Sequence, residues 1–159
     1  MFRALVVLAN VLTVAGAVLC AVVHAFSFAD VTPRFLAQLF AVTILAVFPL
    51  SGFAILLLLR VGRSYGVSGV QLSTFIAQRA PKWLRRLGIA VFVYSLLHFF
   101  FEAIGTGKIA GLARSPLASA FVAWFYLMFA EVFTVALADP TVLEPRARRH
   151  DKGHTQHAE

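Results

Sequence analysis

Between Arg34 and Arg60 the chain holds 25 consecutive residues without a charge, from Phe35 to Leu59. As an α-helix this run would be about 37 Å long, which exceeds the roughly 30 Å hydrocarbon core of a bilayer. A soluble domain rarely contains such a run, because one side of the helix would face water. The run therefore predicts a helix that spans a membrane.

Three further apolar segments have a comparable length, and the chain is 60% hydrophobic with only 13% charged residues. We expect membrane-spanning helices over about 4–26, 34–60, 83–104 and 116–138. The first segment is longer than the apolar part of a signal peptide, so we expect it to be retained. These segments predict an all-α, four-helix transmembrane bundle over residues 1–140, followed by a basic, flexible tail over 141–159.

The longest connection follows the second predicted helix and contains a pattern of its own. Ser68 and Gln71 have the spacing of a helix capping box, and Leu72, Phe75 and Ile76 then fall on one helical face. This pattern predicts a short amphipathic helix between the second and third membrane-spanning helices. We expect it to lie on the membrane surface; the alternative is an ordinary solvated loop helix.

The distribution of positive charge predicts an orientation. Eleven Lys and Arg residues fall on one side of the predicted bundle and three, Arg34, Lys108 and Arg114, on the other. Cytoplasmic loops carry the excess of such residues, so we expect both termini and the interfacial helix in the cytoplasm. We expect a multi-pass protein of the plasma membrane, in bacteria the inner membrane. The two short outer connections predict that helices one and two, and helices three and four, form antiparallel pairs.

Glu131 is the acidic residue predicted deepest in the membrane. A charged carboxylate facing lipid there would cost at least a few kcal/mol, so we expect it to be protonated, paired or exposed to a water-filled cavity. Estimated helix depths place Glu131, Ser51 and Asn10 about 6 to 8 Å on the cytoplasmic side of the midplane. We favour a structural carboxylate, held by Ser51, Asn10 and the carbonyl that Pro49 leaves free. The alternative is a proton- or cation-responsive group of a transporter.

A second polar layer is predicted toward the outer side. On the third helix one face combines five residues: Gly88, Val91, Ser95, His98 and Glu102. His98 and Glu102 are spaced as two ligands of one metal could be, and His24 of the first helix could add a third. His24 and His98 could also bracket a b-type haem, although their estimated depths differ by about 7 Å. We prefer a hydrogen-bonded pair of His24 and Glu102, and we predict no cofactor and no metal.

No nucleophile–base pair, phosphate-binding glycine loop or pair of cysteines occurs in the sequence, which favours a non-enzymatic protein. Basic residues are not interleaved with base-stacking aromatic residues, so nucleic-acid binding is not expected. The first hypothesis is an accessory or assembly subunit of a membrane complex, whose partners are the bilayer and another membrane protein or a second copy. The alternatives are a proton- or cation-coupled carrier that uses Glu131 and a haem-binding redox subunit that uses His24 and His98.

Overall fold

The computed structural model describes residues 2–28, 33–67, 69–106 and 116–139; within them, the side chains of residues 70, 102–106 and 116–117 are not described. These ranges fold as helices and contain no strand. The helices are α1 (Phe2–Ser27), α2 (Arg34–Tyr65), α3 (Gly69–Arg79), α4 (Lys82–Thr106) and α5 (Pro116–Ala138). The tail that we predict over 141–159 lies outside the described residues.

Four of these helices, α1, α2, α4 and α5, are long and apolar enough to cross a membrane. They coincide with the four predicted segments, and the all-α architecture is confirmed for the described residues. The short helix predicted in the longest connection is present as α3, although Ser68 of its predicted capping box lies outside the described residues. This arrangement is that of a small multi-pass membrane protein.

The second helix continues past Arg60, where the prediction ended, to Tyr65. Gly66 ends it in the left-handed conformation, with φ 66°, and the backbone N–H of Val67 donates a 3.0 Å hydrogen bond to the carbonyl of Gly62. A glycine that ends a helix in this way is a common stop signal, because it adopts positive φ without strain. Charged residues alone do not stop a helix, so the helix extends into the basic connection.

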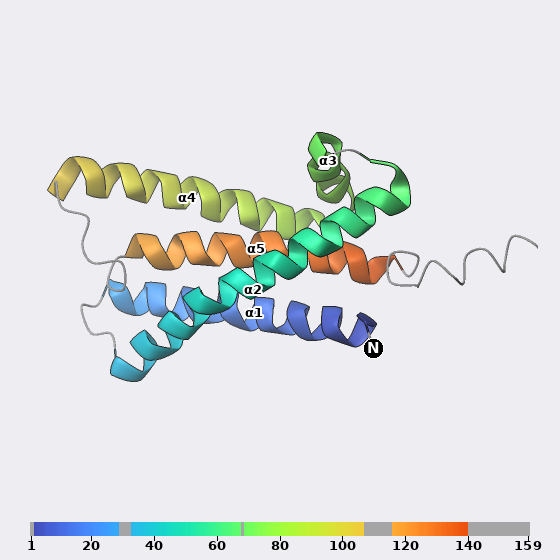
Figure 1. Ribbon diagram of the computed structural model, residues 1–159. Helices are drawn as coiled ribbons and strands as arrows, with labels where there is room; N and C mark the ends of the chain where they lie inside the picture. Colours follow the sequence, from blue (N-terminus) through green and yellow to red (C-terminus); the bar gives the residue numbers. More distant parts are fainter. Residues whose placement is uncertain (1, 29–32, 68, 107–115, 140–159) are drawn as a thin grey trace, which may run out of the picture.

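Helix α5 lies at the centre of the bundle (Figure 1). It packs against all four other helices, most extensively against α1 and then α4, and 56% of its membrane-spanning window is buried. Helices α1 and α2 run in opposite directions and contact each other, and so do helices α4 and α5, as predicted. Helix α2 crosses the bundle obliquely and contacts α5 more extensively than it contacts α1.

The interface between α1 and α5 is built on small residues of α1. Its buried positions recur every three or four residues, as one face of a helix requires. They are Val6, Ala9, Thr13, Gly16, Cys20 and Val23. Gly16 lies against the ring of Tyr126, and the hydroxyl of Tyr126 donates a 2.7 Å hydrogen bond to the backbone carbonyl of Thr43 on α2. Tyr126 therefore connects three helices at the core of the protein.

Helix α3 lies across one end of the bundle, where it contacts α5 and α2 (Figure 1). Leu72 and Ile76 are buried, and Phe75 is partly buried, as the predicted apolar face requires. The guanidinium of Arg79 lies 3.8 Å from the centre of the Phe75 ring and 4.9 Å from that of Tyr65 at the end of α2. The contact of Arg79 with Tyr65 attaches α3 to α2, whereas its contact with Phe75 lies within α3.

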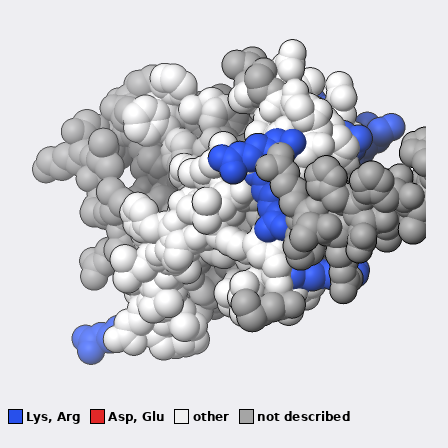
Figure 2. Space-filling model, turned by 45° about the vertical axis from the view of Figure 1, so that its right-hand side comes forward, with Lys and Arg blue, Asp and Glu red and all other residues white. Residues whose placement is uncertain are grey.

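Positive charge gathers at the end of the bundle that carries α3 (Figure 2). Among the described residues, every Lys and Arg except Arg34 belongs to the helix ends or to the short helix that meet there. We call this end the basic end; its residues are Arg3, Arg60, Arg63, Arg79, Lys82, Arg85 and Arg86. Arg34 begins α2 at the opposite end.

Candidate functional site

Glu131 lines a cavity of about 590 Å³ near the basic end, between α3, α4 and α5, with one residue of α2. Its side chain is only 7% exposed, because α5 is the central helix and α4 passes directly over this position. Gly88 makes that approach possible: a Cβ atom placed there would lie 3.4 Å from Oε1 of Glu131. The carboxylate is therefore buried in protein on one side and faces a cavity on the other.

The lining of this cavity is polar on the side of α3. Ser73, Thr74 and Gln78 contribute two hydroxyls and an amide from consecutive turns of the short helix. The opposite wall is aromatic, with Phe92 of α4 and Trp124 of α5 packed at a ring-centroid distance of 4.8 Å. We call this space the polar cavity.

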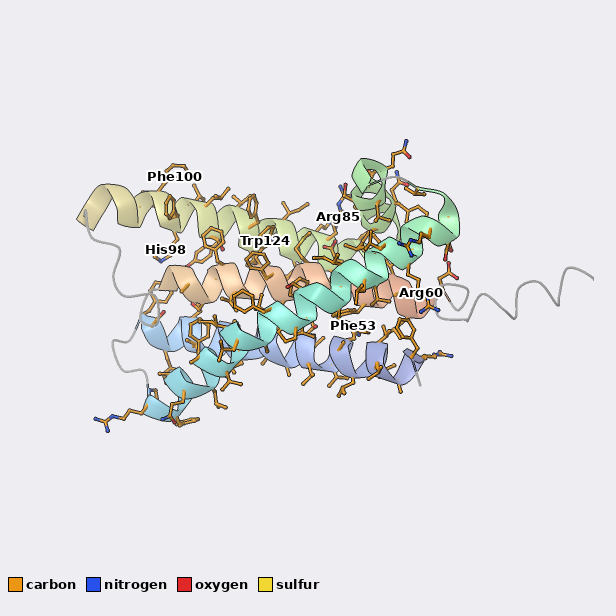
Figure 3. All side chains as sticks on the ribbon, in the orientation of Figure 1. Phe53, Arg60, Arg85, His98, Phe100 and Trp124 are labelled. Carbon is orange, nitrogen blue, oxygen red and sulfur yellow. The ribbon has the colours of Figure 1, made fainter. Side chains whose placement is uncertain are left out.

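Arg85 also lines the polar cavity and is the basic partner of Glu131 that sequence reasoning did not identify (Figure 3). It comes from the first turn of α4, one helical turn before Gly88, and its charge interacts electrostatically with the carboxylate of Glu131. A cationic and an anionic side chain thus share one cavity. The presence of Arg85 changes the interpretation of Glu131, because a carboxylate near a guanidinium at a cavity can bind polar ligands as well as stabilise packing.

A second cavity, of about 600 Å³, adjoins the first between α2 and α5, and we call it the apolar cavity. It shares Leu58, Met128 and Val132 with the polar cavity, so the two cavities are adjacent. Phe48 and Ile55 line it and are 70% and 55% exposed, which shows that it opens to the side of the bundle. We call the two adjacent cavities together the groove; it has a polar end beneath α3 and an apolar end along α2.

Neither of the two side chains predicted to hold Glu131 is hydrogen-bonded to it. Ser51 lines the apolar cavity, and its hydroxyl donates a 2.7 Å hydrogen bond to the carbonyl of Phe48 within α2. Asn10 lies on α1, and its buried Oδ1 accepts no hydrogen bond from the described residues. The similar depth of the three residues was derived from helix length, which does not determine how far each helix is rotated.

His24 lies in a separate cluster toward the opposite end from the basic end. Its Nδ1 is 2.9 Å from the hydroxyl of Ser119 on α5, and its Nε2 is 2.8 Å from the hydroxyl of Tyr94 on α4. The side chain of Glu102, which we predicted as its partner, is not described. The imidazole of His24 thus joins α1, α4 and α5 through two hydroxyls that pattern reasoning did not connect with it.

His98 belongs to the same cluster, on the face of α4 that the sequence predicted; Ser95 on that face is fully buried. The ring centroids of His98 and His24 are 6.3 Å apart, and both rings pack against Tyr94. Both nitrogens of His24 are in contact with hydroxyls, and the Tyr94 ring packs against both histidines. Among the described residues, no three His, Cys, Asp or Glu side chains form a group that could hold a metal ion.

Comparisons of the chain with models of protein families, with curated proteins and with solved structures find no match.

Proposed function

We propose that the protein is a non-enzymatic accessory or assembly subunit of a membrane complex and that its protein partner packs along α4. The observation that carries this proposal is the exposure of α4. Only 17% of its membrane-spanning window is buried, against 56% for the central α5, and its extensive contacts are with α5 alone. A peripheral helix with so much free surface is the side of the bundle best suited to accept another helix.

The outward surface of α4 supports the proposal by its composition. Its exposed large side chains are rich in aromatic residues, which are enriched in protein interfaces. These residues include Trp83, Tyr94, Phe99, Phe100 and Phe101. Near its midpoint the helix contacts α1, where the Tyr94 hydroxyl meets His24. The side of α4 that faces away from α5 is available to a partner within the bilayer, where helices associate by close packing.

A photo-crosslinking amino acid in place of Val93 or Leu97 tests this proposal. These residues are one turn apart on α4 and are 47% and 53% exposed. We expect both positions to give a covalent adduct with one membrane protein of defined mass after irradiation of native membranes. Val14 and Val18 on α1, which are 52% and 58% exposed, are the matched controls and should not give that adduct. Adducts of equal yield from α1, or none from α4, would contradict the proposal.

We propose further that the basic end faces the cytoplasm of a bacterial cell. The concentration of Lys and Arg residues at this end supports it, and so does the course of α3 across the bundle, which suits a helix at the membrane surface. A cysteine at Phe35, beside Arg34, should react with a membrane-impermeant maleimide in intact cells, whereas one at Gln71 of α3 should react only after permeabilisation. The native Cys20 is buried and should stay unlabelled in both cases. The reverse labelling pattern would refute this orientation.

A second candidate is a proton- or cation-coupled carrier, which the position of Glu131 at a cavity favours. In that case the carboxylate would have to bind and release the transported ion. Proton-driven uptake into vesicles containing the purified protein, abolished by Glu131→Gln, would favour the carrier over the accessory role. Uptake that is absent, or unchanged by this substitution, would exclude a coupling role for Glu131.

A further inference from the structure

The groove formed by the polar and apolar cavities has the chemical polarity of an amphiphilic molecule. At the basic end its polar lining consists of a guanidinium, two hydroxyls, an amide and a carboxylate, contributed by Arg85, Ser73, Thr74, Gln78 and Glu131. Beyond Met128 and Val132 it is lined almost entirely by hydrocarbon. The change from polar to apolar follows the bundle axis, in the same direction as the change from headgroups to hydrocarbon in a bilayer leaflet.

The charges near the polar cavity select for an anion. Arg85 lines the cavity itself, and the other cations of the basic end surround the same end of the bundle. The described acidic side chains comprise only Glu131 and Asp139. A guanidinium presents paired N–H donors that match the oxygens of a phosphate, and the hydroxyls and the amide can donate to the remaining oxygens.

The apolar cavity is suited to a hydrocarbon chain. Its volume of about 600 Å³ lies within the range of known ligand pockets, and Phe48, Ile55 and Phe125 at its mouth are well exposed. A molecule that enters from the bilayer can therefore slide in sideways, with its chain between α2 and α5 and its headgroup beneath α3. No passage through water is needed.

We propose that this groove binds one anionic glycerophospholipid, with the phosphate at Arg85 and an acyl chain in the apolar cavity. Glu131 lies about one turn deeper than Arg85, beside Gly88. It faces the headgroup from below and limits the affinity for a negative charge. This inference does not rest on the partner interface of α4, because the groove opens between α2 and α5 and the proposed interface is the outward side of α4.

The test measures retention of phosphatidylglycerol by the purified full-length protein in a mild detergent, by native mass spectrometry. We expect one tightly bound lipid per chain and at least a tenfold weaker binding in Arg85→Gln, since a charge-assisted hydrogen-bond pair contributes roughly tenfold or more in affinity. Arg86→Gln is the matched control, because Arg86 is the next residue of α4, is exposed and does not line the groove. It should bind the lipid within about twofold of the unaltered protein.

The apolar half of the groove has its own pair of variants. Ile55→Trp places a large ring in the apolar cavity and should lower retention of the lipid strongly. Leu56→Trp adds the same ring at a position that is 64% exposed and outside the groove, and should leave retention unchanged. Both positions face away from the core, so both variants are expected to fold. Equal effects of the two tryptophans would overturn the placement of the acyl chain.

Glu131→Gln separates this inference from the carrier. Removal of a negative charge beside the phosphate should preserve or increase lipid retention, whereas a site that binds a cation would lose its ligand. The proposal is overturned if Glu131→Gln abolishes binding, if phosphatidylcholine binds as tightly as phosphatidylglycerol, or if Arg86→Gln weakens binding as much as Arg85→Gln. Displacement of the lipid by millimolar inorganic phosphate alone would also overturn it, because the acyl chain would then contribute nothing.

Discussion

Gly16→Ala is expected to destabilise the folded protein by about 1–3 kcal/mol, the range for an extra methyl group in a well-packed core. A Cβ atom at this position would lie 2.6 Å from Cε1 and Cζ of Tyr126 and 2.9 Å from its Cδ1. The ring cannot turn away easily, because it is almost completely buried and its hydroxyl is held by the carbonyl of Thr43. The helices α1 and α5 must therefore separate, although their interface is the most extensive in the protein.

Unfolding in mixed micelles with increasing SDS measures this effect. Gly52→Ala is the matched control, because a Cβ atom there meets nothing within 4 Å; it should be neutral or slightly stabilising. In a Tyr126→Leu background, which removes the ring, the loss caused by Gly16→Ala should shrink to less than half. An unchanged loss in that background would show that the ring is not what excludes the methyl group.

The four membrane-spanning helices could be predicted because lipid imposes a length and an apolar composition that are visible in a single segment. The C-terminal end of α2 was placed too early because the prediction weighted the charge of Arg60 and passed over Gly66, whose effect on the backbone is stronger. Which helices pack against one another was harder to predict from the sequence. That α5 lies in the centre depends on the summed fit of several faces, which no single segment contains.

Sequence periodicity predicts the buried face of α1 only approximately. In the sequence, residues at alternating spacings of three and four predict a packing face made of Asn10, Thr13, Ala17, Cys20 and His24. Thr13 and Cys20 are fully buried. The predicted face passed over Gly16, because the true face is rotated slightly and contacts an aromatic ring on another helix. The glycine itself was the available signal, since a residue without a side chain in a membrane helix commonly marks a close helix contact.

In the candidate site, too, the features set by one helix could be predicted, whereas those set by the packing of two helices could not. The depth of Glu131 follows from its distance along α5, but its proximity to Arg85 depends on where α4 begins and on how α4 is rotated against α5. Gly88, one turn after Arg85 on the predicted inward face of α4, was the available signal. The cluster around His24 was foreseen only in part. Its two hydroxyl partners lie on helices whose relative heights were known to about one turn.

His24→Leu is expected to destabilise the protein by about 1–3 kcal/mol and to loosen α4 from α1. The imidazole contacts the hydroxyls of Ser119 and Tyr94, donating through one ring nitrogen and accepting through the other. Ser119 is 1% exposed, so a leucine leaves its hydroxyl buried and deprived of this partner. A serine hydroxyl can turn and donate to a helix carbonyl instead. We therefore expect the loss of the Ser119 contact to lower the free energy of unfolding by an amount near the lower end of that range. Tyr94 is 40% exposed and should contribute less.

The double variant His24→Leu/Ser119→Ala distinguishes the loss of the hydrogen bond to Ser119 from the loss of the packing contacts of the imidazole ring. Removal of both partners leaves no buried hydroxyl without its imidazole, so the double variant should be more stable than His24→Leu alone in SDS unfolding. Phe26→Leu, at an exposed position of the same helix, is the control for the introduction of leucine and should be close to neutral. If the double variant is less stable than His24→Leu by the full effect of Ser119→Ala, the two side chains are not coupled. The histidine would then stabilise the bundle through its contacts with Tyr94, Phe28 and His98.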